Sequence, residues 1–155
     1  MTTSASRSED LSRDLTSWPV LRRDSGIASM AASQYDPTIE RQRAALISAI
    51  TFIAKNSINW SVRQAVPIER VSAETALAFV QRLPIDRAFP KIAPDGEGGV
   101  VLVWETPSRR ALITCDGVRL LLVRDPGGPS SFHFSPMRFD GEIIPSIILE
   151  NLPRR

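Results

Sequence analysis

The sequence predicts an α+β domain in which two N-terminal helices pack on a four- to five-stranded antiparallel meander sheet. Apolar residues recur with a helical period between residues 36 and 84, and with a period of two after residue 84. The later segments are joined by short connections, which favours antiparallel neighbours. With 155 residues, the chain has room for one domain (36–155) preceded by an arm (1–35).

The arm, residues 1–35, contains eight serines and three threonines and shows no sustained hydrophobic period. Such a composition buries too little apolar surface to order itself, so we expect a flexible Ser/Arg-rich segment. Leu11, Leu15 and Trp18 nevertheless recur at helical spacing ahead of Pro19. They form either a short docking helix for a partner or for the domain itself, or a chance triplet.

The first helix is predicted from Asp36-Pro37 to about Asn56, because Asp is a good N-cap and Pro favours the first helical position. Phe52 lies away from the inward stripe and marks a second apolar strip. The arm or a loop would cover this strip, or else a second subunit would. The inward stripe consists of Ile39, Leu46, Ile47, Ile50, Ile53 and Ala54.

A loop holding Trp60 is predicted from Asn56 to Arg70, followed by a second helix. Ser72 is the expected N-cap of that helix, and Glu74 is expected in its first turn. Leu83-Pro84 should end it. Its predicted buried stripe is Ala73, Ala76, Leu77, Val80 and Leu83.

Strands are predicted over residues 100–105, 110–115, 118–124 and about 131–134, with Asp116-Gly117 as a tight hairpin turn. The isoleucine-rich residues 143–149 close the chain. Because Pro145 interrupts them, they form either an edge strand or a short helix.

Both faces of this sheet are predicted to be apolar. Val101 and Val103 point to the face opposite that of Leu102 and Trp104, and the 118–124 strand shows the same two-sided pattern. Two helices can cover one face. The other face requires the C-terminal isoleucines, the arm or a second polypeptide, most simply in a two-fold homodimer.

The charge pattern does not select a partner. The formal net charge is +2, but seventeen arginines stand against two lysines. Arginine suits contacts with phosphate, and Phe132, Phe134 and Phe139 lie near Arg138 in the manner of a stacking platform. A nucleic-acid-binding protein is therefore one alternative, and codon bias in a GC-rich genome explains the same surplus.

The sequence predicts no catalytic, cofactor or metal site. Cys115 and His133 are the single cysteine and histidine, and strand alternation places the histidine at the surface. The glycine-rich stretch 95–99 precedes a strand, whereas a phosphate cradle precedes a helix. An enzyme using turn carboxylates remains as a further alternative, with the candidates Asp95, Glu97, Glu105 and Asp116.

We expect a cytoplasmic protein with no membrane association. The first ten residues lack the apolar core of a signal peptide, and the most apolar stretch, 44–54, is too short to cross a bilayer. A single cysteine also fits a reducing compartment.

A pattern of short motifs extends from the first helix to the strand that ends in Leu-x-Trp. It comprises a Trp loop leading into Ala-x-Pro-Ile, a helix ending in Leu-Pro, and Pro-x-Ile-x-Pro-Asp-Gly before that strand. Through this pattern the chain resembles a group of small uncharacterised bacterial proteins, although Ser61-Val62 stand where that group has Asp-Gly. The resemblance covers about half of the chain, implies the same fold and carries no established activity. Its residues are Trp60, Ala65, Pro67, Ile68, Leu83, Pro84, Pro90, Ile92, Pro94, Asp95, Gly96, Gly99, Leu102 and Trp104.

These observations predict a non-enzymatic protein–protein interaction module, such as a toxin–antitoxin, immunity or accessory component of a bacterial complex. The expected partner is another protein chain, in a homodimer or a heteromeric complex. The candidate partner-binding residues are Leu11, Leu15, Trp18, Phe52, Trp60, Val101 and Val103.

Overall fold

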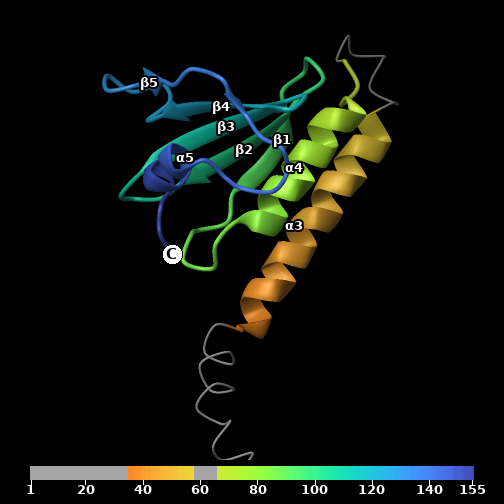
Figure 1. The fold of residues 1–155 in the computed structure, drawn as a ribbon, viewed down its shortest axis with the longest axis horizontal. Coiled ribbons are helices and arrows are strands. Elements are labelled where there is room, and N and C mark those ends of the chain that lie inside the picture. The colour runs from red at the N-terminus through yellow and green to blue at the C-terminus, as the bar shows by residue number, and fades with distance from the viewer. Residues whose placement is uncertain (1–34, 58–65) are drawn as a thin grey trace, which may run out of the picture. The chain divides into compact units, whose positions relative to one another are not determined.

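A computed structural model describes residues 35–57 and 66–155, and residues 38–155 fall in one compact unit. Two helices, α3 (Pro37–Asn56) and α4 (Arg70–Arg82), precede the sheet, and a short helix, α5 (Ser146–Asn151), follows it (Figure 1). The predicted α+β class with an antiparallel sheet is confirmed. The strands are β1 (Lys91–Pro94), β2 (Val100–Glu105), β3 (Arg110–Asp116), β4 (Arg119–Arg124), β5 (Phe132–His133) and β6 (Met137–Arg138).

The sheet is an antiparallel meander in the order β1-β2-β3-β4-β5, with β6 also paired to β4. Gly117, at φ +60°, forms the turn between β3 and β4 as predicted. The predicted number of strands was too low. β1 was missed because prolines bound it, and the strand expected at 131–134 is shortened to two residues ahead of Pro136, whose nitrogen cannot donate to a ladder.

One face of the sheet, here called the inner face, forms the core of the domain. Eight of its side chains are at most 1% exposed. Helix α4 packs on β2 and β3, and its Phe79 makes an edge-to-face contact with Trp104 at 6.2 Å between ring centroids. The eight residues are Val100, Leu102, Trp104, Ala111, Ile113, Cys115, Leu120 and Leu122.

Helix α3 follows its predicted bounds and its predicted stripe. Ile39 and Ile50 are buried, and the other four stripe residues pack against the core or lie partly buried beside it. Phe52, by contrast, is 65% exposed, which confirms that it lies off the stripe. The stripe therefore fixes which side of α3 meets the rest of the domain.

The N-terminus of α4 differs from the prediction. The helix begins at Arg70 with Glu69 as N-cap, so Ser72 lies inside the helix and is buried. Its hydroxyl accepts the N–H of Gly117 at 2.8 Å, and the Thr75 hydroxyl donates to the Gly117 carbonyl at 2.6 Å. Ser72 therefore joins α4 to the β3–β4 turn, a long-range contact that local capping preferences do not reveal.

The C-terminal isoleucines form a helix after Pro145, which settles the choice left open between strand and helix. Ile144 and Ile148 are buried in the same cluster as the inner face, together with Leu152. They therefore complete the inner-face core, and the option that they cover the opposite face is wrong.

Candidate functional site

The outer face of the sheet carries a continuous apolar patch. The register places Val103 across from Leu112 and Leu112 across from Val123, and the next row follows the same three strands. All of these side chains are only partly buried, and none belongs to the hydrophobic cluster of the core. We call the set the outer-face patch: Val101, Val103, Leu112, Thr114, Leu121 and Val123.

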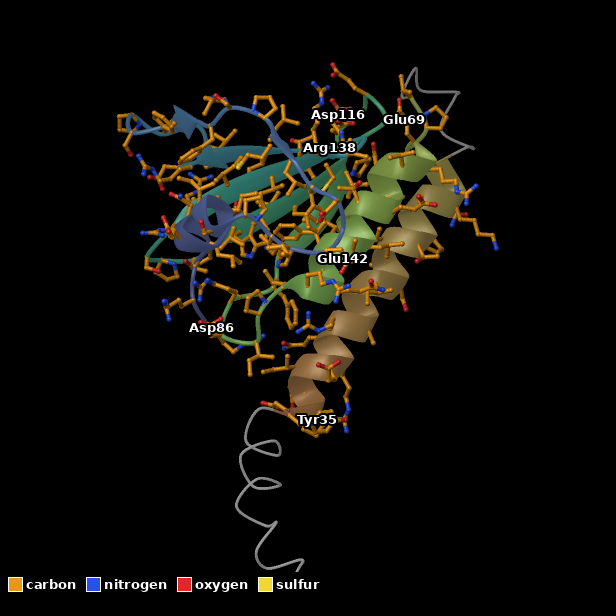
Figure 2. The ribbon with its side chains drawn as sticks, in the orientation of Figure 1. Tyr35, Glu69, Asp86, Asp116, Arg138 and Glu142 are labelled. Carbon is orange, nitrogen blue, oxygen red and sulfur yellow. The ribbon has the colours of Figure 1, made fainter. Side chains whose placement is uncertain are left out.

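Charged pairs bound this patch along the strand direction. Glu105 on β2 pairs with Arg110 on β3 at 3.6 Å at one end. At the other end Asp116 pairs with Arg119 at 2.8 Å, and Arg119 lies across from Arg138 of β6 in the register. Asp116 and Arg138 are labelled in Figure 2. The outer face thus has an apolar centre and two charged ends, each with both signs.

The structure places only some of the predicted partner-binding residues together. Val101 and Val103 lie in the outer-face patch. Phe52 points away from the core on α3, whose stripe packs toward the inner-face cluster, so it does not join the two valines. The predicted residues that lie outside the described part of the chain are Leu11, Leu15, Trp18 and Trp60.

Sequence reasoning missed Leu112 and Thr114 as members of this surface. Their signal was present, since they alternate along β3 with the buried Ala111, Ile113 and Cys115. Because β3 is the middle strand of the five-strand order, these two residues occupy the centre of the patch.

The two candidate groups for nucleophilic chemistry lie on opposite faces of the sheet. Cys115 is buried on the inner face, and burial raises the pKa of its thiol from 9.0 to about 12. His133 is exposed and lies across from Val123 of the outer face, as strand alternation predicted. The structure therefore does not assemble a cysteine–histidine pair.

We expect the Cys115 thiol to resist thiol reagents at pH 8 in the native protein and to react upon unfolding. A thiol with a pKa of about 12 stays protonated at that pH, and the thiolate is the reactive form. Since the native thiol binds its proton more tightly than the unfolded one, stability should also fall as the pH rises above about 9. Labelling of the thiol at pH 8 in increasing concentrations of urea tests its resistance to the reagent. Fast labelling without urea would contradict it.

The glycine-rich stretch forms the turn that leads into β2. The Asp95 carboxylate accepts the backbone N–H groups of Glu97 and Gly99, both at 2.7 Å. Gly98 adopts φ +100°, and a Cβ on Gly99 would lie 2.9 Å from the carbonyl oxygen of Cys115. Asp95 thus already binds two of the amides that a phosphate cradle would offer.

Replacing Asp95 by alanine should lower the free energy of unfolding by about 1–2 kcal/mol, because two amides of the turn lose their acceptor. Asp95→Asn keeps a carbonyl oxygen at this position and should lose less. Urea unfolding followed by circular dichroism measures both. Equal stability of Asp95→Ala and the wild type would contradict this role for the side chain.

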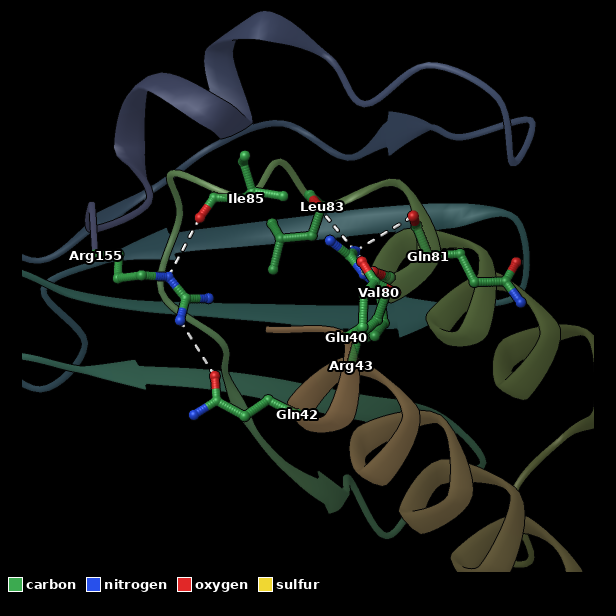
Figure 3. Close-up of polar contacts among 8 residues, drawn as sticks. All are labelled: Glu40, Gln42, Arg43, Val80, Gln81, Leu83, Ile85 and Arg155. Carbon is green, nitrogen blue, oxygen red and sulfur yellow. Dashed lines mark hydrogen bonds and ion pairs between the residues drawn. The ribbon is translucent and has the colours of Figure 1, made fainter. Parts of the chain in front are cut away.

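Arginine side chains donate hydrogen bonds to backbone carbonyls near the C-terminal ends of α4 and α5. Arg43 of α3 donates to the carbonyls of Val80 and Leu83 at 2.6 and 2.9 Å, and to that of Gln81 at 3.3 Å (Figure 3). The last carbonyls of a helix lack partners within it, and a guanidinium offers several donors at once. Arg87 and Arg109 donate in the same way to the carbonyls of Leu149 and Glu150 near the end of α5. Arg82 and Arg155 donate to the carbonyls of Gly141 and Ile85, which lie outside the helices.

The predicted stacking platform around Arg138 is wrong. Phe139 is 2% exposed and meets Phe79 edge to face inside the core. Arg124, not Arg138, lies over the Phe132 ring, at 5.5 Å from its centroid. The strand register explains this, because it pairs Arg124 with Phe132 across β4 and β5.

No protein-family model matches the chain, and no curated protein or solved structure matches it. Over residues 35–57 and 66–155, no three His, Cys, Asp or Glu side chains are grouped so that they could hold a metal ion. The helices in this part of the chain are all too short or too polar to cross a membrane. Function is therefore inferred from the geometry of the chain itself.

Proposed function

We propose that this chain is a non-enzymatic protein-interaction module and that the outer-face patch is its binding surface. One observation carries the proposal: five aliphatic side chains and a threonine stand side by side on the sheet face that does not contribute to the core. An antiparallel sheet that faces water normally presents polar residues there. Contiguous apolar surface of this kind is typical of protein interaction sites.

The arrangement of the patch also supports a protein partner. Protein interfaces have an apolar centre from which charged residues are depleted, and a polar rim. Here the apolar rows lie between the Glu105–Arg110 pair and the Asp116–Arg119 pair. A component of a bacterial toxin–antitoxin, immunity or accessory complex would need such a surface.

The same geometry offers less support to an enzyme that uses turn carboxylates and to a nucleic-acid-binding protein. Asp95 precedes β2 and Glu105 ends it, so these carboxylates lie at opposite ends of one strand. Five arginines donate to backbone carbonyls within the domain, which leaves fewer guanidinium groups for phosphate. The outer-face patch itself carries no charge that would attract a nucleic acid.

Site-specific photo-crosslinking in cells tests the proposal. A photoreactive amino acid at position 103 should give protein adducts, whereas the same group at the exposed position 55 on α3 should not. Leu121→Asp should abolish the adducts from position 103, because it places a charge in the same patch. Equal adduct yields from positions 103 and 55 would contradict a binding role for the outer face.

A further inference from the structure

We infer that a cavity between the end of α5, the β2–β3 turn and residues 152–154 binds a small organic molecule that carries a phosphate group. The cavity measures about 440 Å³, which lies in the range of small-molecule sites. Among the described residues that line it, the charged ones are Arg87, Arg109, Arg154 and Glu150. None of the lining residues belongs to the outer-face patch, so the inference is independent of the proposed protein-binding surface.

Backbone pairing brings the first two arginines together. Arg87 and Arg154 face each other in an antiparallel bridge, and the Arg155 N–H donates to the Asp86 carbonyl at 2.9 Å beside it. Directly opposed residues of such a pair present their side chains on the same side. Both guanidinium groups pair with the same oxygen, Oδ2 of Asp86. Arg87 and Arg154 therefore place two positive charges next to each other at one wall of the cavity.

The end of α5 holds the third guanidinium beside that of Arg87. Arg109 Nη1 donates to the Glu150 carbonyl at 2.7 Å, and Arg87 Nε donates to the carbonyl of the preceding residue, Leu149, at 3.1 Å. The β2–β3 turn also fixes the backbone of Arg109, through hydrogen bonds in both directions between Thr106 and Arg109. Because both side chains are already ordered, an anion that binds them avoids much of the entropic cost of ordering them.

These anchoring bonds leave donors for a ligand, since each guanidinium has five N–H groups. Among the ion pairs of the described residues, none includes Arg109. Ser108, next to it in the turn, also lines the cavity and can offer its hydroxyl. Capping of α5 explains the bonds of Arg87 and Arg109, but it explains neither Arg154 nor the hollow that the three arginines surround.

The charge and the shape of the cavity both favour an organic phosphate. Three guanidinium groups and one carboxylate line the cavity, and a phosphate monoester carries a charge of about −1.5 to −2 at pH 7. Guanidinium groups bind phosphate oxygens through paired, charge-assisted hydrogen bonds. Leu149, Leu152 and Pro153 supply an apolar wall for the organic part of the ligand.

An NMR titration of the full chain with phenyl phosphate, at constant ionic strength, tests the inference. The signals of Ser108 and Arg109 should shift and saturate with a Kd of about 1 mM or below, as expected of a ligand of this size. Benzoate has the same ring but a single negative charge, and it should bind at least about tenfold more weakly. Failure to saturate would overturn the inference, as would equal affinity for the two compounds.

Charge-removing variants locate the site. Arg109→Gln and Arg154→Gln should each weaken binding of phenyl phosphate about tenfold, because each removes a charged donor. Arg41→Gln removes the same charge from the exposed side of α3 and should change the affinity by about twofold or less. The Arg154 side chain is 74% exposed, so its variant should keep the fold even if Arg109→Gln loses stability. Equal weakening by Arg41→Gln and Arg154→Gln would show that phosphate responds only to the net charge, and would overturn the site.

A short single-stranded DNA separates a small molecule from a nucleic acid as the source of the phosphate. Its diester groups carry one charge each and follow one another along a chain, whereas the cavity has room for a single small ligand. The DNA should therefore leave phenyl phosphate bound. Displacement of phenyl phosphate by the DNA would overturn the small-molecule class of ligand.

Discussion

Replacing Arg43 by alanine is expected to lower the free energy of unfolding by about 3 kcal/mol. The side chain is 12% exposed and donates to two carbonyls within 2.9 Å at the end of α4. Its guanidinium also lies over the ring of Phe89, 5.4 Å from the centroid. Alanine would leave partly buried carbonyl groups without a donor and would separate α3 from the end of α4.

Two variants control this prediction. Arg43→Lys keeps the charge but has one compact donor group, so it should lie between alanine and the wild type. Arg41→Ala removes an exposed arginine from the same helix and should change stability by about 0.5 kcal/mol or less. Urea unfolding measures all three. The same loss from Arg41→Ala as from Arg43→Ala would show that the bonds to α4 are unimportant.

Ile113→Asp is expected to abolish folding, whereas Leu112→Asp leaves the fold intact. The two residues are neighbours on β3, but Ile113 is fully buried on the inner face and Leu112 lies in the outer-face patch. Burying a carboxyl group without a partner costs several kcal/mol even when it takes up a proton, which is comparable to the whole stability of a typical domain, about 5–15 kcal/mol. On the outer face the carboxylate keeps access to water.

Far-UV circular dichroism and thermal unfolding compare this matched pair. We expect a native spectrum and a cooperative transition for Leu112→Asp, and neither for Ile113→Asp. If both variants were unfolded, the outer face would be part of the core of this chain. If both were folded, the assignment of the inner face would be wrong.

Local sequence signals were sufficient where short-range physics decides the structure. Asp36-Pro37 and the 3.6-residue stripe predicted α3, and the period of two predicted β2, β3 and β4 within one residue. The same alternation predicted an apolar outer face containing Val101 and Val103.

The features that the sequence patterns did not predict depend on contacts between residues far apart in the chain. Ser72 resembles an N-cap, yet it bonds to Gly117, forty-five residues away. Arg43 donates to carbonyls at the end of α4 that lie 37 and 40 residues further along the sequence, and no local spacing rule predicts such bonds. β1 is stabilised by its pairing with β2, despite the prolines that weaken its local signal. Each of these depends on a partner that only the folded chain supplies.

Labelling of a cysteine at position 103 inside cells tests most directly whether protein covers the outer face. Native Cys115 is buried and its thiol pKa is raised to about 12, so it adds little background. Val103→Cys should react with a maleimide far more slowly than Ser48→Cys on the exposed side of α3, and adding Leu112→Asp to Val103→Cys should restore fast labelling. Val103→Cys labelling at the same rate with and without Leu112→Asp would contradict a protein-covered outer face.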